Sequence, residues 1–117
     1  MLKKNKFLLL PLAFVLSSGV VASSASGEPA GNETKGKYAY RNVYKDCEKR
    51  GEISSSKPPL NPDAKTQAQW ERVFKDKEFK QFGCSTEWSA LSAETLGDIE
   101  AYLWKHAVDS PSPAKCK

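Results

Sequence analysis

The chain has few side chains with nitrogen or sulfur ligands for metals, with one histidine, one methionine and three cysteines among its 117 residues. The methionine is Met1, and the histidine is His106. A single histidine with no matching spacing of cysteines or carboxylates is weak evidence for a metal site, and none is predicted. No segment alternates between polar and apolar residues with a period of two, so strands are not expected either.

A long hydrophobic run is also missing, because the longest one, residues 7–16, is too short to span a bilayer. A basic start precedes this run and small residues follow it, which is typical of a secretory signal peptide. Cleavage after Ala22 or after Ala25 fits the sequence. We therefore expect residues 1–25 to be a signal peptide, and the mature protein to be periplasmic or secreted, with no membrane span.

The chain keeps little excess charge once that segment is removed. Its 18 basic residues include three lysines of the signal, so 18 − 3 = 15 remain against 14 acidic residues, a net charge of +1. Nucleic-acid binding is not expected, because no basic excess is left to neutralise phosphates.

The remaining chain divides into a leader and one helical domain. Residues 26–36 are polar and rich in glycine, which predicts a flexible leader. Residues 37–117 predict an all-α fold with three main helices and long loops. The first helix is expected over Lys37 to Arg50, with Gly51 in the left-handed position that follows a helix. Its apolar stripe holds Tyr40, Tyr44 and Cys47, with Val43 alongside.

The other two helices have clear starting signals. Thr66 and Gln69 form a capping-box pattern, and Ser92 is a good N-cap for a helix with Leu96, Ile99 and Leu103 on its apolar stripe. Prolines exclude a helix between residues 51 and 63. Trp104 lies off the last stripe, which makes it a candidate exposed anchor for another protein.

No arrangement of residues predicts catalysis. A thiol mechanism needs Cys47 or Cys84 beside His106, and nothing in the sequence positions such a pair. Asp98 and Glu100 are two residues apart on one predicted helix, so their carboxylates point in different directions. We expect no catalytic residues and no enzymatic activity.

Four segments, in order, carry a resemblance to a known family: Gly36–Arg41 leading into a cysteine, Lys65–Trp70, Leu91–Leu103 and His106–Pro111. With this order and spacing, residues 36–117 resemble the small class I c-type cytochromes, in particular monohaem members from anaerobic bacteria. The resemblance implies a cytochrome c-like helical fold and a link to electron transfer.

The haem attachment motif of that family is degenerate in this chain. The family binds haem through Cys-x-x-Cys-His, whose histidine ligates the iron. That pattern falls on residues 44–48, where Tyr44 replaces the first cysteine, Cys47 is the second, and Glu48 replaces the histidine. The comparison implies a cytochrome fold without haem, in which Tyr44 fills the vacated space. No cofactor is expected.

These features predict a non-catalytic accessory or interaction partner of a redox system, with a periplasmic redox protein or cytochrome complex as its partner. The alternative is an electron carrier that holds haem c through Cys47 alone, with His106 as an unusual axial ligand. The other interpretation of His106 is a partly exposed residue in the last turn of a helix, where the helix dipole favours it.

Three cysteines in an exported chain predict one disulfide and one free thiol. Cys84 and Cys116 are the preferred pair, because Cys84 lies in a loop and Cys116 in a tail that nothing else would fix. A Cys47–Cys116 bond is the main competitor. In the preferred pairing, Cys47 is a buried thiol on the apolar stripe of the first helix.

Overall fold

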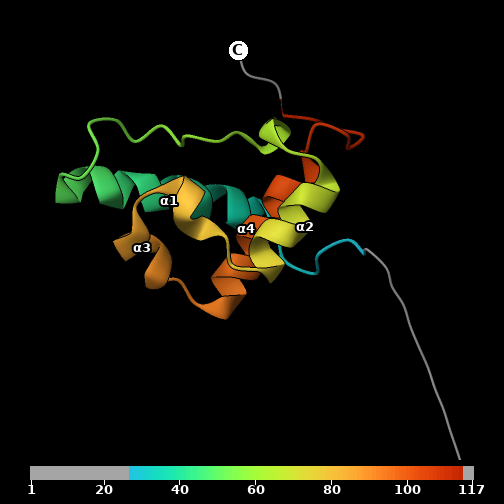
Figure 1. Ribbon diagram of the computed structural model, residues 1–117, viewed down its shortest axis with the longest axis horizontal. Coiled ribbons are helices and arrows are strands. Elements are labelled where there is room, and N and C mark those ends of the chain that lie inside the picture. The colour runs from blue at the N-terminus through green and yellow to red at the C-terminus, as the bar shows by residue number, and fades with distance from the viewer. Residues whose placement is uncertain (1–26, 115–117) are drawn as a thin grey trace, which may run out of the picture.

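The computed structural model describes residues 27–114, which contain helices and turns but no strand (Figure 1). The predicted signal peptide therefore lies outside the described residues, as does Cys116. The all-α prediction is confirmed for the described part. Its elements, in chain order, are α1 (Glu33–Arg50), the 3-10 turn η1 (Pro62–Ala64), α2 (Gln67–Lys75), the 3-10 turn η2 (Phe79–Phe82), α3 (Ser85–Ser89) and α4 (Ala93–Lys105).

Helix α1 begins four residues before the predicted start. The side chain of Asn32 caps it by accepting a hydrogen bond from the backbone N–H of Lys35 at 2.9 Å. The backbone N–H of Asn32 itself donates to Oδ1 of Asp98 on α4 at 2.8 Å. The prediction of a flexible leader is therefore wrong for residues 33–36, because a cap and a contact to α4 fix this end of the helix. The far end is as expected, with Gly51 in the left-handed conformation at a φ of 93°.

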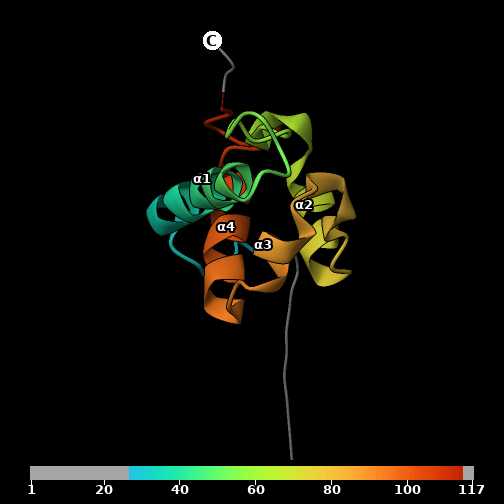
Figure 2. The ribbon, with the colours of Figure 1, turned by 90° about the vertical axis from the view of Figure 1, so that its left-hand side faces the viewer.

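Helices α1 and α4 cross at very short range (Figure 2). A Cβ atom built on Gly36 of α1 would lie only 1.8 Å from the backbone oxygen of Asp98, so only glycine fits there. The predicted apolar stripes meet along this contact. The stripe residues Tyr40, Val43, Tyr44, Cys47, Ile99 and Leu103 are all buried.

The proline-containing segment after α1 runs back along that helix to η1, as Figure 1 shows. The Tyr40 hydroxyl holds it by donating to the backbone oxygen of Leu60 at 2.6 Å. The indole N–H of Trp70, on α2, donates to the backbone oxygen of Pro62 at 2.8 Å. Two buried aromatic side chains thus fasten an otherwise irregular loop to the core.

The predicted starting signals of α2 and α4 are confirmed. Thr66 and Gln69 form a complete capping box, with side chain to backbone distances of 3.1 and 2.8 Å. The Ser92 hydroxyl accepts from the N–H of Thr95 at 3.1 Å. Trp104 on α4 is only partly exposed, and its indole N–H donates to Oε2 of Glu71 at 2.8 Å. It therefore contributes to packing between α2 and α4 and is not an exposed anchor.

The sequence did not predict η2 or α3. Phe82, in η2, is 1% exposed, and Trp88, in α3, is 4% exposed. Their rings stack with centroids 4.4 Å apart. These two short elements fold a pair of large aromatic side chains onto the end of α1 that carries Tyr44 and Cys47. They define the surroundings of the candidate site.

No helix of the described part is long and apolar enough to span a membrane.

Candidate functional site

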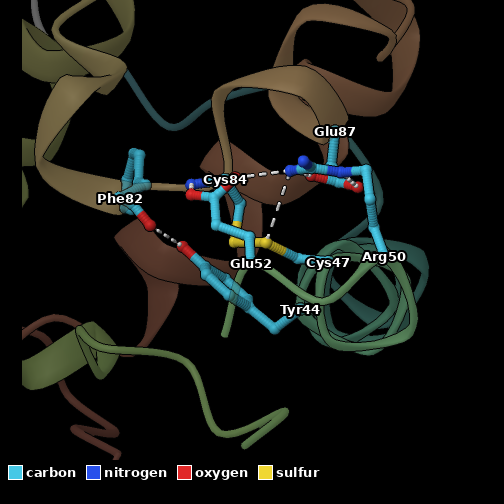
Figure 3. The surroundings of a disulfide bond; sticks show 7 residues. All are labelled: Tyr44, Cys47, Arg50, Glu52, Phe82, Cys84 and Glu87. Atoms are coloured by element: carbon cyan, nitrogen blue, oxygen red, sulfur yellow. Dashed lines mark hydrogen bonds and ion pairs between the residues drawn. A yellow bond between two sulfur atoms is a disulfide. The ribbon is translucent and has the colours of Figure 1, made fainter. Parts of the chain in front are cut away.

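A disulfide bond joins Cys47 on α1 to Cys84, the residue just before α3 (Figure 3). The two cysteines are 37 residues apart in sequence, and their Cα atoms are 5.9 Å apart. Both are almost completely buried, at 0% and 1% exposure. The bond ties α1 to the η2–α3 segment.

This pairing corrects two expectations. The predicted Cys84–Cys116 bond is wrong, because Cys84 is bonded to Cys47 and a cysteine forms only one disulfide. The prediction that Cys47 is a buried free thiol is right about burial and wrong about bonding. The physical reason is the η2 turn, which the sequence did not reveal and which returns Cys84 to the apolar stripe of α1.

The three residues aligned with the haem attachment motif have different surroundings. Tyr44 is buried, and its hydroxyl donates to the backbone oxygen of Phe82 at 3.0 Å (Figure 3). The sulfur of Cys47 is bonded to Cys84. Glu48 is exposed to solvent on α1. Of the three side chains, only that of Tyr44 lies in the core without a covalent bond to another residue.

Aromatic rings fill the space around Tyr44. The ring of Tyr40 lies edge-on to that of Tyr44, with centroids 5.5 Å apart, and 6.0 Å from the ring of Phe82. The ring of Phe79 stacks on that of Trp88, with centroids 5.5 Å apart. We call Tyr40, Tyr44, Phe79, Phe82 and Trp88 the aromatic cluster. Within the described part, the buried indole N–H of Trp88 has no hydrogen-bond acceptor.

The electrostatics of the cluster reflect its low polarity. Burial raises the pKa of Tyr44 from 10.0 to about 12. Burial also raises the pKa of Tyr40, and the neighbouring Tyr44 adds to the shift. Both hydroxyls are therefore neutral hydrogen-bond donors at ordinary pH. They anchor loops and have no acid–base role in the described contacts.

A charged network covers the disulfide on its outer side. Arg50, one turn beyond Cys47 on α1, donates through Nε and Nη2 to the two carboxylate oxygens of Glu87, both at 2.8 Å. Its Nη2 also lies 2.5 Å from Oε1 of Glu52 and 3.8 Å from Sγ of Cys47. The other oxygen of Glu52 accepts the backbone N–H of Cys84 at 3.1 Å.

This network shifts the pKa of its members in the directions that ion pairing favours. The hydrogen bonds to Arg50 lower the pKa of Glu87. The same bonds, with those to Glu52, raise the pKa of Arg50. The sequence held one usable signal for this arrangement, since Arg50 is three residues after Cys47 and so lies on the same face of the helix. Nothing in the sequence placed Glu87 there.

His106 lies far from this site. It follows α4, where its Nε2 is 3.1 Å from Oε1 of Glu33 and its Nδ1 is 2.8 Å from the backbone oxygen of Ser112. Glu33 and Cys47 are 14 residues apart in the straight run of α1, which separates them by about 21 Å along the helix axis. The structure therefore does not bring His106 and Cys47 together, although the sequence grouped them as haem-binding candidates.

Two hollows adjoin the aromatic cluster. A pocket of about 550 Å³ opens beside the disulfide, and its lining includes Glu52, Cys84 and Tyr44. A groove of about 360 Å³ lies against Phe79 and Trp88 of the cluster. We call it the Trp88 groove; its lining residues are Lys77, Phe79, Lys80, Ser85, Trp88, Ser89, Leu91 and Leu96.

Comparison with models of protein families, with curated proteins and with solved structures found no match for this chain. The site consists of a disulfide, an aromatic cluster, a charged network and two hollows.

Proposed function

We propose that this protein is an exported, cytochrome c-like protein that carries no haem and serves as a non-catalytic partner of an electron-transfer system. The observation that carries the proposal is the state of residues 44–48. The sulfur of Cys47 is bonded to Cys84, while Tyr44 occupies core space among the rings of Tyr40 and Phe82. A thioether to haem needs that sulfur free and that space open.

The alternative function, electron transfer by a singly attached haem, makes larger demands on the molecule. The disulfide would have to be absent, and the aromatic cluster would have to move out of the core. Cys47 and His106 would also have to serve one porphyrin, although about 21 Å of helix α1 separates Cys47 from Glu33, the contact of His106. No contact in the described part favours this arrangement.

The Trp88 groove is the surface on which we place the partner. Aromatic and leucine side chains line its floor, and Lys77 and Lys80 are both exposed beside them. No acidic residue is among its lining residues. Apolar centres with polar rims are typical of protein interfaces, and opposite charge steers the approach of a partner. The partner we propose is therefore a redox protein with acidic groups around an apolar contact.

The first test is the intact mass of the full chain, exported in a host that attaches haem to cytochromes and kept non-reduced. We expect the mass of the processed chain less two hydrogens, for one disulfide. A mass higher by one haem would refute the proposal and identify Cys47 as the attachment site. An unprocessed chain would refute the export step alone.

The second test is site-specific crosslinking in the exporting cell. A photoreactive amino acid at Ser89, which is exposed and lines the Trp88 groove, should capture a redox protein. The same group at Lys45, exposed on α1 and outside the groove, is the matched control. Charge reversal by Lys77→Glu with Lys80→Glu should reduce the crosslink from Ser89. Equal capture from both positions, or capture of a protein without a redox group, would contradict the proposed partner.

A further inference from the structure

Cys47, Cys84 and Glu52 form a set of three metal-binding side chains around one point. Their ligand atoms, two sulfurs and a carboxylate oxygen, all lie within 4.8 Å of one another. In the oxidised protein the two sulfurs are bonded to each other and cannot act as thiolate ligands. We propose that reduction of this disulfide creates a binding site for Zn²⁺ made of Cys47, Cys84 and Glu52.

The donor set suits zinc. Thiolate sulfur and carboxylate oxygen are both common zinc ligands, at roughly 2.3 Å and 2.0–2.2 Å, and zinc prefers four of them in a tetrahedron. Three side chains and one water complete that number. Two sulfurs bound to one tetrahedral zinc are roughly 3.8 Å apart. Side-chain rotation provides this separation without moving the backbone, because the Cα atoms of Cys47 and Cys84 are already 5.9 Å apart.

The surroundings hold Glu52 in place and leave an approach open. One Glu52 oxygen accepts the backbone N–H of Cys84, and the other accepts from Arg50. Such outer contacts orient a ligand, as they do in established metal sites. The pocket of about 550 Å³ beside the disulfide is lined by both Glu52 and Cys84, so an ion and a water molecule can reach them.

The charge balance also favours a divalent cation. Once both thiols are deprotonated, the two thiolates and the carboxylates of Glu52 and Glu87 carry a charge of −4, against +1 on Arg50, which pairs with both carboxylates. A Zn²⁺ ion changes this net charge from −3 to −1. Arg50 lies 3.8 Å from the Cys47 sulfur, where its positive charge favours the thiolate that zinc needs.

The chemistry balances with a dithiol as reductant. The dithiol transfers two electrons and two protons to the Cys47–Cys84 bond and becomes a disulfide itself. The bond breaks to give two thiols. Zinc then displaces the two thiol protons, which leave to solvent, and binds both sulfurs. Thiol–disulfide exchange with an oxidised dithiol reverses the reaction: its disulfide takes two electrons from the thiolates and two protons from solvent, the Cys47–Cys84 bond forms again, and the ion is released.

The test uses the full chain, reduced with a phosphine without oxygen and titrated with Co²⁺ as a coloured substitute for zinc. We expect thiolate-to-cobalt charge-transfer absorption that saturates at one equivalent and disappears when Zn²⁺ is added. The oxidised protein should give none of this absorption. Zinc should also protect Cys47 and Cys84 from alkylation, as mapped by mass spectrometry. A reduced chain without these bands would overturn the proposal.

Variants separate this site from unspecific thiol binding. Glu52→Gln should weaken cobalt binding at least about tenfold. Loss of a residue that only orients a metal ligand typically costs about that much, and Glu52 is proposed to be a ligand itself. Glu48→Gln, which changes an exposed acid on the same part of the chain, is the matched control and should bind as tightly as the wild type. Cys116→Ser should leave both affinity and stoichiometry unchanged. Equal affinity of the two glutamine variants, or loss of binding in Cys116→Ser, would contradict the site.

Helical circular dichroism covers the case in which reduction alone unfolds the chain. Zinc should then restore the helical signal in Glu48→Gln, because metal binding and folding are coupled when the site forms only in the folded state. The same zinc concentration should restore less of it in Glu52→Gln. Restoration in neither variant would refute the proposal.

Discussion

For the substitution Gly36→Ala, helix propensity and tertiary packing predict opposite changes in the free energy of unfolding. Propensity alone predicts that Gly36→Ala stabilises α1 by about 1 kcal/mol, since glycine is a poor helix former. In the folded protein, however, the new Cβ atom would lie 1.8 Å from the backbone oxygen of Asp98 and 2.4 Å from its carbonyl carbon. We expect the packing effect to win.

The magnitude follows from the distance that must be gained. A carbon and a carbonyl oxygen approach to about 3.3 Å, so α1 and α4 must separate by roughly 1.5 Å at this point. The blocking atoms belong to the backbone and cannot rotate away. We therefore expect a loss of roughly 2–3 kcal/mol, the upper end of the usual overpacking cost. For a domain of this size that lowers Tm by roughly 10–20 °C.

The matched control is Gly97→Ala on the opposing helix. A Cβ atom on Gly97 would meet no other atom within 4 Å, so this change should raise stability by roughly 0.5–1 kcal/mol. Guanidinium unfolding of the oxidised proteins, followed by circular dichroism and tryptophan fluorescence, measures both. If Gly36→Ala proves as stable as the wild type, the described contact between α1 and α4 is not present in solution.

Three further predictions concern the candidate site. Reducing the disulfide in the absence of zinc should lower the free energy of unfolding by about 4 kcal/mol in the chain-entropy model for a separation of 37 residues, measured by denaturation with and without reductant. Arg50 lowers the pKa of Glu87 from 4.5, so the ionised carboxylate contributes to the free energy of unfolding above pH 4.5, and this contribution is lost as the pH falls through the lowered value. Glu87→Gln should therefore make the free energy of unfolding fall less steeply with decreasing pH. A decrease as steep as that of the wild type would argue against the ion pair. Tyr44→Phe should destabilise the protein by roughly 1–2 kcal/mol at pH 7, because the Phe82 carbonyl loses its donor. Folding raises the pKa of Tyr44 from 10.0 to about 12, so the wild type should lose stability as the pH rises between these values. Tyr44→Phe should not show this loss, which unfolding curves measured at alkaline pH would test.

Local sequence signals predicted the helical frame well. The capping box of Thr66 and Gln69, the N-cap at Ser92 and the left-handed Gly51 all act over three or four residues, where side-chain chemistry decides the backbone. The apolar stripe of α1 was likewise legible, because a helical period places Tyr40, Tyr44 and Cys47 on one face. These features need no knowledge of the rest of the molecule.

The features that the sequence did not reveal depend on distant partners. The early start of α1 depends in part on the bond from Asn32 to Asp98, 66 residues away, although the N-cap at Asn32 is itself a local signal. The disulfide partner of Cys47 depends on the η2 turn, whose four residues are too few to show a period. The α3 segment has the same difficulty, since a five-residue helix is stabilised by burying Trp88 and not by its own propensity. Tertiary packing decides the disulfide partner and α3, and no local pattern indicates either.

The sulfur of Cys47 can form only one of three bonds at a time: a disulfide, a thioether to haem or a thiolate bond to zinc. A disulfide to Cys84 excludes both a thioether to haem and a thiolate bond to zinc. Reduction removes the first bond and makes the other two available, yet a haem would also have to displace Tyr44, Phe82 and Trp88 from the core. A zinc ion needs only the sulfurs, Glu52 and a water molecule in the adjoining pocket. Oxidised protein should therefore bind neither group, whereas reduced protein supplied with both should take up the metal ion and leave the aromatic cluster packed. Colour, mass and tryptophan fluorescence of one reduced sample distinguish these states, since haem uptake would quench the tryptophans that zinc binding leaves in place.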